Sequence, residues 1–197
     1  MGHLRSICWG LAWLIVCGRA APRAASPPAL VPLRVAVRAD ASVSALTLFT
    51  AKADVVRLFR AAQIDVQWTV TAPDVSLNFC DDLEPCARDV APGALGRAVL
   101  NPRVGRGRVA WIYHERIFRL GAANEVAVAG VLGRVMAHEM AHLLGLTHST
   151  SGLMGAEWSD HELGLASCGL LAFSAEESAW LSTHAAPVAL VTGSEYR

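Results

Sequence analysis

The sequence has few charged residues and no excess of either sign. Asp, Glu, Lys and Arg make up 17% of the chain, with 17 basic against 17 acidic side chains, whereas an average soluble domain has about 25% charged residues. This balance gives no excess of positive charge, which a nucleic-acid-binding protein typically has. A disordered chain is also excluded, because disorder requires low hydrophobicity and high net charge, and 53% of these residues are hydrophobic.

Long apolar runs are also missing. No stretch of about 20 apolar residues occurs, and a membrane-spanning helix needs one. A shorter apolar block at residues 7–17 follows the basic residues His3 and Arg5 and precedes the small residues Gly18 and Ala20, a pattern typical of a secretory signal. We therefore expect residues 1–20 to be a signal peptide, the protein to be secreted or periplasmic, and no transmembrane segment to remain after cleavage. A retained N-terminal anchor is the alternative.

A length of 197 residues predicts one domain. Residues 21–32 are rich in Pro, Ala and Ser and predict a flexible lead-in, so we place a single domain at 33–197 and expect a monomer. After signal removal three cysteines remain, at positions 80, 86 and 168. Three cannot all pair within one chain. A bridge between Cys80 and Cys86 is the preferred pairing, and the others stay open.

Hydrophobic periodicity predicts the elements of this domain. Alternation of apolar and polar residues predicts strands at 33–38, 66–70, 75–79, 94–100 and 108–117. Helical spacing predicts long helices at 43–64 and 125–144, the second capped by Asn124. A last helix is expected at 174–184, because Ser174 and Glu177 match the capping-box pattern.

One short stretch, which begins in the second long helix and extends past its end, contains residues that suit catalysis. Residues 138–148 contain His138, Glu139, His142, Gly145 and His148. Two histidines four residues apart lie on one helical face, one turn from each other. A glycine at the helix end lets the chain turn sharply and bring the third histidine back. Three protein ligands and an open position are typical of catalytic zinc.

Glu139 lies beside His138 but about 100° around the helix, so it need not bind the metal. We interpret it as the general base that takes a proton from a zinc-bound water and passes it to the leaving amine. Core or surface histidines on a packing helix are the alternative interpretation. That alternative leaves unexplained why a helix rich in Val, Leu and Ala would bury such polar groups, which are costly when unpaired.

Residues 138–148 resemble the HExxHxxGxxH signature of the metzincin zinc endopeptidases. Residues 149–154 resemble the Met-turn of that family, and the short distance to Met154 is most similar to the matrixin branch. The resemblance implies one catalytic zinc held by His138, His142 and His148, with Glu139 as the general base and Met154 as a structural floor. It also implies that a peptide substrate lies antiparallel to an edge strand, here residues 94–100: Ala94, Leu95, Gly96, Arg97, Ala98, Val99 and Leu100.

Together with the predicted elements, the resemblance implies an α+β fold. We expect a mixed, twisted five-stranded sheet with two long helices on one side, a zinc-site helix that ends at a glycine turn, and a small C-terminal lobe with one helix. No tyrosine stands among the four residues directly after Met154, and the histidine and aspartate set of the matrixin structural zinc is absent from the sequence. These departures leave regulation and substrate preference open.

The leading hypothesis is an exported zinc-dependent endopeptidase that acts on peptide or protein substrates. A zinc-holding binding protein without turnover is the first alternative, although a structural site needs no base and is normally closed by a fourth protein ligand. A zinc amidase acting on a non-protein amide is the second. Other polar residues are weaker candidates: we interpret His161 as a solvated surface histidine, and His114 and Glu115 as the outward face of a strand.

Overall fold

The computed structural model describes residues 29–39, 43–124 and 127–185. The expected signal peptide and most of the lead-in lie outside these ranges. The described elements, in order, are β1 (Val31–Arg38), α1 (Ala45–Ala61), β2 (Ile64–Trp68), β3 (Val75–Phe79), the 3-10 turn η1 (Pro85–Ala87), β4 (Gly96–Asn101), β5 (Arg106–Ile112), α2 (His114–Asn124), α3 (Val128–Leu143), α4 (Asp160–Ser167) and α5 (Ala175–His184). Among the described residues, no helix is both long and apolar enough to cross a membrane.

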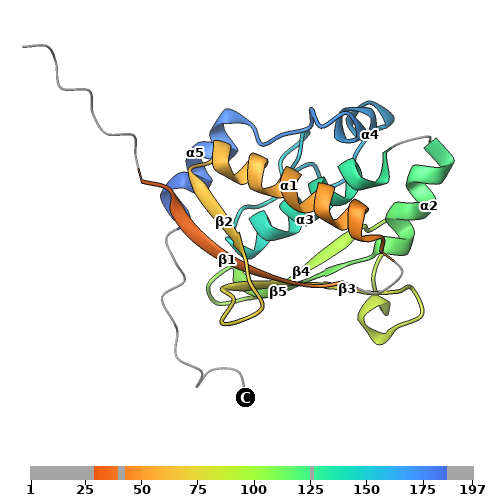
Figure 1. The fold of residues 1–197 in the computed structure, drawn as a ribbon, viewed down its shortest axis with the longest axis horizontal. Helices are drawn as coiled ribbons and strands as arrows, with labels where there is room; N and C mark the ends of the chain where they lie inside the picture. The colour runs from red at the N-terminus through yellow and green to blue at the C-terminus, as the bar shows by residue number, and fades with distance from the viewer. Residues whose placement is uncertain (1–28, 40–42, 125–126, 186–197) are drawn as a thin grey trace, which may run out of the picture.

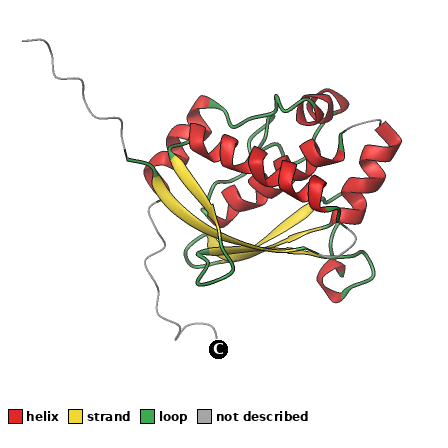
Figure 2. Cartoon of the chain, in the orientation of Figure 1, coloured by secondary structure: helices red, strands yellow, loops and turns green. Residues whose placement is uncertain are grey.

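The five strands form one sheet in the order β2-β1-β3-β5-β4. Strands β2, β1, β3 and β5 pair in parallel, whereas β4 pairs antiparallel with β5 and lies at the edge. The long helices α1 and α3 lie across the same face of this sheet (Figures 1 and 2). The prediction of a mixed five-stranded sheet with two long helices on one side is confirmed.

Alternation along the strands places apolar side chains in the layer between sheet and helices. In β1, Leu33 and Val35 are buried, whereas Arg34 between them is exposed. In β3, Val75 and Leu77 are buried in the same layer. One face of the sheet is therefore covered by helices, and the polar positions of these strands lie on the other.

Helix α3 lies at the centre of this layer. Every residue from Gly130 to Leu143 except His142 is buried. Two glycines allow other elements to approach its backbone closely. A Cβ at Gly133 would lie 3.0 Å from the carbonyl oxygen of Ala51 in α1, and a Cβ at Gly130 would lie 2.7 Å from that of Ala166 in α4. This burial fixes the position of the predicted site helix.

Helix α3 contains one fully buried arginine, Arg134. Its guanidinium donates to the carboxylate of Asp54 in α1 and to the carbonyl oxygen of Leu171, the latter at 3.2 Å. One side chain thus connects α3 with α1 and with the chain between α4 and α5.

The prediction of a strand over 108–117 is wrong beyond Ile112, because helix α2 begins at His114. The buried side chains of Tyr113 and Ile117 have helical spacing, and this signal overlaps the end of the strand alternation. Both His114 and Glu115 therefore lie on a helix and not on a strand face.

The second long helix begins later than expected. Its N-cap is Ala127, and Asn124 ends α2 and does not cap α3. The C-terminal part contains α4 in addition to the expected α5. Helix α4 begins at a capping box of Ser159 and Glu162, a signal that sequence reasoning used only for α5.

We predict that Asp54→Ala lowers the free energy of unfolding by about 3–5 kcal/mol, because it leaves the buried charge of Arg134 without its partner. Asp74→Ala is the matched control. Both carboxylates have a side-chain exposure of 21%, but Arg34, the partner of Asp74, is 50% exposed. Asp74→Ala should therefore lower the free energy of unfolding by less than about 1 kcal/mol. Urea unfolding at neutral pH measures both, and equal losses would contradict the role given to Arg134.

Candidate metal centre

Helix α3 presents His138 and His142 on one face. Their ring centroids are 4.6 Å apart, and their Nε2 atoms are 3.0 Å apart. The helix then ends in a glycine turn: the N–H of Gly145 donates to the carbonyl of His142, and the N–H of Leu146 donates to that of Ala141. These two bonds form a Schellman motif, and the φ of +102° at Gly145 is readily adopted only by glycine.

The turn brings His148 back to the helix. Its Nε2 lies 3.1 Å from the Nε2 of His142, and the three histidines form a group whose ligand atoms lie within 4.8 Å of one another. The predicted convergence of His138, His142 and His148 is therefore present in the structure.

Hydrogen bonds to backbone carbonyls indicate the protonation of two of these rings. The Nδ1 of His138 lies 2.8 Å from the carbonyl oxygen of Leu153, and the Nδ1 of His142 lies 2.7 Å from that of Leu146. A carbonyl oxygen can only accept, so we assign the proton to Nδ1 in both rings. Each Nε2 then carries a lone pair, and the two lone pairs face each other at 3.0 Å.

Facing lone pairs require a cation between them, either a proton or a metal ion. Burial lowers the pKa of His138 to about 4, and the neighbouring imidazoles act in the same direction, although the bond to Leu153 opposes them. Burial also lowers the pKa of His142. A proton is thus disfavoured near neutral pH. Three converging imidazole nitrogens fit a zinc ion with one open coordination position.

Glu139 is buried on the side of α3 toward the edge strand. Its side chain is 5% exposed. A Cβ on Gly96 of β4 would lie 2.5 Å from its Oε1, so only glycine leaves room for the carboxyl group. Burial raises the pKa of Glu139 to about 8, and a hydrogen bond from the backbone N–H of Ala98 acts in the opposite direction. Glu139, the residue after His138, therefore has its carboxyl group packed against β4.

A cavity of about 690 Å³ opens beside His138 and Glu139. Its wall comes from residues 91–95, α2, α3, the chain after Met154, and α4. Apolar side chains that line it are Leu95, Leu120, Val135, Trp158 and Leu163. Two arginines of α2, Arg116 and Arg119, also line it, and no motif in the sequence marks them. Arg116 donates to the carbonyl oxygens of Ala91 and Ala94 at 2.8 and 2.9 Å.

The chain after His148 forms a closed turn. The N–H of Ser149 donates to the carbonyl of Met154 at 2.9 Å, and the N–H of Gly155 donates to that of Gly152 at 3.0 Å. Met154 is fully buried in the main core. The closed turn thus leads directly into a buried methionine.

The expected substrate strand lies at the sheet edge. Strand β4 covers Gly96–Asn101, while Ala94 and Leu95 precede it and line the cavity. Of the weaker candidates, His161 is exposed and lies outside the three-histidine group. His114 is buried, with its Nε2 3.1 Å from Asp81, and Glu115 is exposed. The site includes neither of them.

The preferred disulfide is present. Cys80 and Cys86 are bonded, and Cys168 is free and exposed. The bridge closes a small loop ahead of residues 91–95. Arg116 holds the same region through its bonds to Asp82 and to two carbonyls. The wall of the cavity that faces α2 is thus fixed from two directions.

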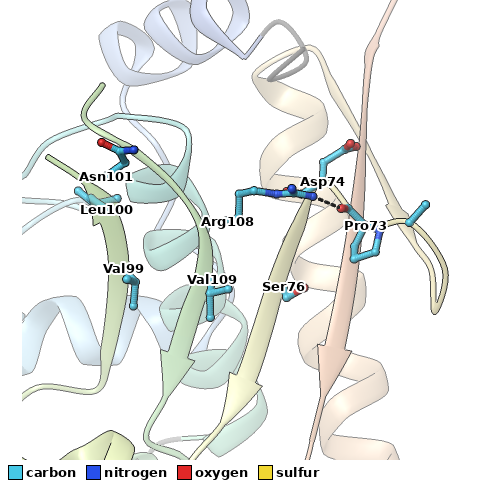
Figure 3. A pocket seen from close by; sticks show the side chains of 9 residues that line it. Pro73, Asp74, Ser76, Val99, Leu100, Asn101, Arg108 and Val109 are labelled. Atoms are coloured by element: carbon cyan, nitrogen blue, oxygen red, sulfur yellow. Dashed lines mark hydrogen bonds between the residues drawn. The ribbon is translucent and has the colours of Figure 1, made fainter. Parts of the chain in front are cut away.

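A second hollow lies elsewhere in the fold. It has a volume of about 440 Å³ and is lined by residues of β3, β4 and β5, among them Ser76, Val99 and Arg108. Figure 3 shows these side chains on the side of the strands away from the helices. Arg108 donates to the carbonyl oxygens of Pro73 and Asp74 at 3.0 and 3.3 Å. None of the three histidines lines this hollow.

Comparison with known proteins bears on the fold. No protein-family model matches the chain, and no curated protein matches its sequence. The archaemetzincin of Methanopyrus kandleri superposes with a TM-score of 0.53 over 79% of this chain and 96% of its own, at 15% identity. This chain has the fold of archaemetzincin. Myroilysin matches with a TM-score of 0.35 at 13% identity, over 61% of this chain and 50% of its own, a likeness too weak to support a conclusion.

We predict that the carboxyl group of Glu139 makes the metal-free protein progressively less stable, relative to Glu139→Gln, as the pH rises from about 4.5 to about 8, the usual and the raised pKa of this group. In this window the unfolded chain ionises the carboxyl group and the folded chain keeps it protonated. Relative to Glu139→Gln, the wild type should lose up to about 1.4 kcal/mol per pH unit. Urea unfolding in the presence of a chelator measures the difference, which should vanish below pH 4.5. Parallel pH profiles would contradict the burial of an ionisable group.

Proposed function

We propose that this protein is a zinc-dependent endopeptidase. The observation that carries the proposal is the convergence of three histidine Nε2 atoms beside a buried glutamate on the same helix. The likeness to archaemetzincin in fold and the resemblance of residues 138–154 to the metzincin signature support it. The proposed ligands are His138, His142 and His148, with one zinc ion.

Zinc bound to three neutral imidazoles supplies a Lewis acid that polarises a peptide carbonyl and lowers the pKa of a water molecule. His138 and His142 hold their rings in place through their Nδ1–H bonds to backbone carbonyls. Such bonds fix the tautomer and make the opposite nitrogen the ligand atom. The chain's own contribution is thus a rigid set of donor atoms.

Glu139 is the proposed general base. It accepts a proton from the attacking water and delivers it to the nitrogen of the leaving amine. Burial raises its pKa to about 8 in the metal-free protein, and a bound divalent cation lowers it from there, because an opposite charge favours the ionised form. A carboxyl group with a pKa near neutrality can both take and return a proton.

Strand β4 is the proposed docking edge for the substrate backbone. An edge strand offers unpaired N–H and C=O groups to an extended peptide. The cavity beside Glu139 is lined by Leu95, Val135 and Trp158, and suits a large apolar side chain of the substrate. Backbone pairing along β4 would accept many sequences, and this cavity would select among them.

Three finer features belong to the same proposal. Met154 would be the methionine of a Met-turn, on the grounds of its burial and of the closed turn that carries it. The chain would be closest to the matrixin branch, because of the short spacing between His148 and Met154. Residues 1–20 would direct export, on the pattern of their sequence.

The zinc-loaded full chain should cleave members of a diverse quenched-fluorescent peptide library, and Glu139→Ala should lower turnover by about 10²–10⁴-fold, the usual contribution of a general base. Both proteins should contain one zinc, because Glu139 is not a ligand. Glu176→Ala, an exposed carboxylate on α5, is the control and should retain wild-type turnover.

Equal zinc content without cleavage by any of these proteins would contradict the peptidase and favour a zinc-holding binding protein or an amidase with another substrate. A folded wild-type chain that binds no zinc would contradict the metal site. Elemental analysis of the purified proteins decides between these results.

Gly96→Ala should lower turnover by about 10²-fold while zinc stays bound, since a shift of about 1 Å in a catalytic group can cost that much. The added methyl group would overlap Oε1 of Glu139 and displace it. Gly164→Ala on α4 is the matched control, because nothing lies within 4 Å of its added Cβ. Wild-type turnover in Gly96→Ala would show that the carboxyl group need not lie against β4.

A further inference from the structure

Two helices of this fold begin with the same capping box. In α4 the hydroxyl of Ser159 accepts from the N–H of Glu162, and the N–H of Ser159 donates to Oε2 of Glu162 at 2.9 Å. In α5, Ser174 and Glu177 repeat this arrangement, with 2.8 Å for the corresponding bond. The two caps thus share these two bonds, and in α4 the hydroxyl of Ser159 also donates to Oε2 of Glu162 at 2.8 Å.

The second carboxylate oxygen distinguishes the two glutamates. Oε1 of Glu162 accepts from the N–H of Gly152 at 2.7 Å, a residue in the turn after the third histidine. In the part of the chain that the structure describes, the hydrogen bonds of Glu177 stay within its own cap. Capping alone therefore accounts for Glu177 but not for Glu162.

Gly152 immediately precedes the residue that orients a proposed ligand. The carbonyl oxygen of Leu153 accepts from Nδ1 of His138 at 2.8 Å and from Nε1 of Trp158 at 3.3 Å. Gly152 has a φ of +79°, in the region where glycine moves freely and other residues are strained. A charge-assisted bond at its N–H therefore restrains the most adaptable residue of the turn.

We infer that Glu162 is a positioning residue of the metal centre. Its carboxylate fixes Gly152, which fixes the direction of the Leu153 carbonyl, which in turn fixes the ring and tautomer of His138. The inference rests on the zinc site of the proposed function and does not depend on which bond the protein cleaves. Partners that contact a ligand directly change metal affinity by about 10–100-fold when removed, and Glu162 acts on such a partner, the Leu153 carbonyl, through Gly152.

The local and the long-range roles of Glu162 can be separated within α4. Ser159→Ala removes the hydroxyl of the cap, including its bond to Oε2 of Glu162 at 2.8 Å, and keeps both partners of the bond between Oε1 of Glu162 and the N–H of Gly152. Glu162→Ala removes both. Glu177→Ala removes the equivalent glutamate from α5 and leaves the turn at Gly152 untouched. These three variants of the full chain form a matched set.

Glu162→Ala should bind zinc about tenfold more weakly than the wild type, at the lower end of the range for such partners. Competition with a chromophoric chelator measures this affinity. Cobalt substituted for zinc should show a shifted visible absorption band in this variant, because the ring of one ligand has moved. Ser159→Ala and Glu177→Ala should keep the wild-type metal affinity and cobalt spectrum, although the loss of a cap lowers their melting temperatures.

Wild-type affinity and spectrum in Glu162→Ala would overturn the inference and leave Glu162 as a helix cap. Equal loss of affinity in all three variants would also overturn it, since the cause would then be general stability. If Glu162→Ala does not fold, Glu162→Gln replaces it, with a smaller loss expected because an amide offers one acceptor oxygen in place of two. A chain that binds zinc and cobalt but cleaves no peptide contradicts the proposed function alone, because both readouts here are metal binding.

Discussion

Helix α3 carries an arginine, two histidines and a glutamate into the interior of the fold, where each would be destabilising without a partner. The structure provides a different partner for each polar group. Arg134 has the carboxylate of Asp54, the two imidazoles have backbone carbonyls at their Nδ1 atoms, and Glu139 has the N–H of Ala98 together with a raised pKa. Two polar groups of α3 remain without a complementary partner among the described residues: Nη2 of Arg134 has no hydrogen-bond partner, and the Nε2 lone pairs of the two imidazoles face each other. The proposed metal ion would satisfy the facing lone pairs.

The histidines and the glutamate of α3 contact different parts of the chain. The carbonyls that orient His138 and His142 belong to Leu153 and Leu146, both after the glycine turn. The strand that confines Glu139 belongs to the sheet. Two of the proposed ligands, His138 and His142, thus depend on the C-terminal part of the chain, whereas the proposed base depends on β4. Because His138, His142 and Glu139 all lie on α3, this helix fixes their positions relative to one another.

Local features of this site could be predicted from the sequence. The four-residue spacing of His138 and His142, the glycine turn and the return of His148 follow from helix geometry and glycine chemistry, which need no knowledge of the rest of the fold. The capping box of α5 was predictable for the same reason. Helix α2 was missed because Tyr113 and Ile117 continue an apolar pattern that began as strand alternation, and periodicity alone does not mark the change.

Contacts between distant segments could not be predicted in this way. No spacing rule places Gly96 against Glu139, Arg116 against the carbonyls of Ala91 and Ala94, or Arg134 against Asp54. The capping box of Glu162 was visible in the sequence, but its bond to Gly152 depends on how the turn and α4 pack together. Sequence patterns thus identify candidate functional residues, whereas the contacts between their atoms are determined by tertiary packing.

The two sides of α3 also differ in what a small displacement would do. A shift of β4 would act on the carboxyl group of Glu139, whereas the carbonyls bonded to the Nδ1 atoms of His138 and His142 belong to the C-terminal part of the chain. A shift of the turn at Gly152 would rotate His138 and leave Glu139 against Gly96. The proposed metal ligands and the proposed base therefore depend on separate contacts. A peptide that pairs with β4 would act directly on the side that holds the base, and would reach the ligands only through α3.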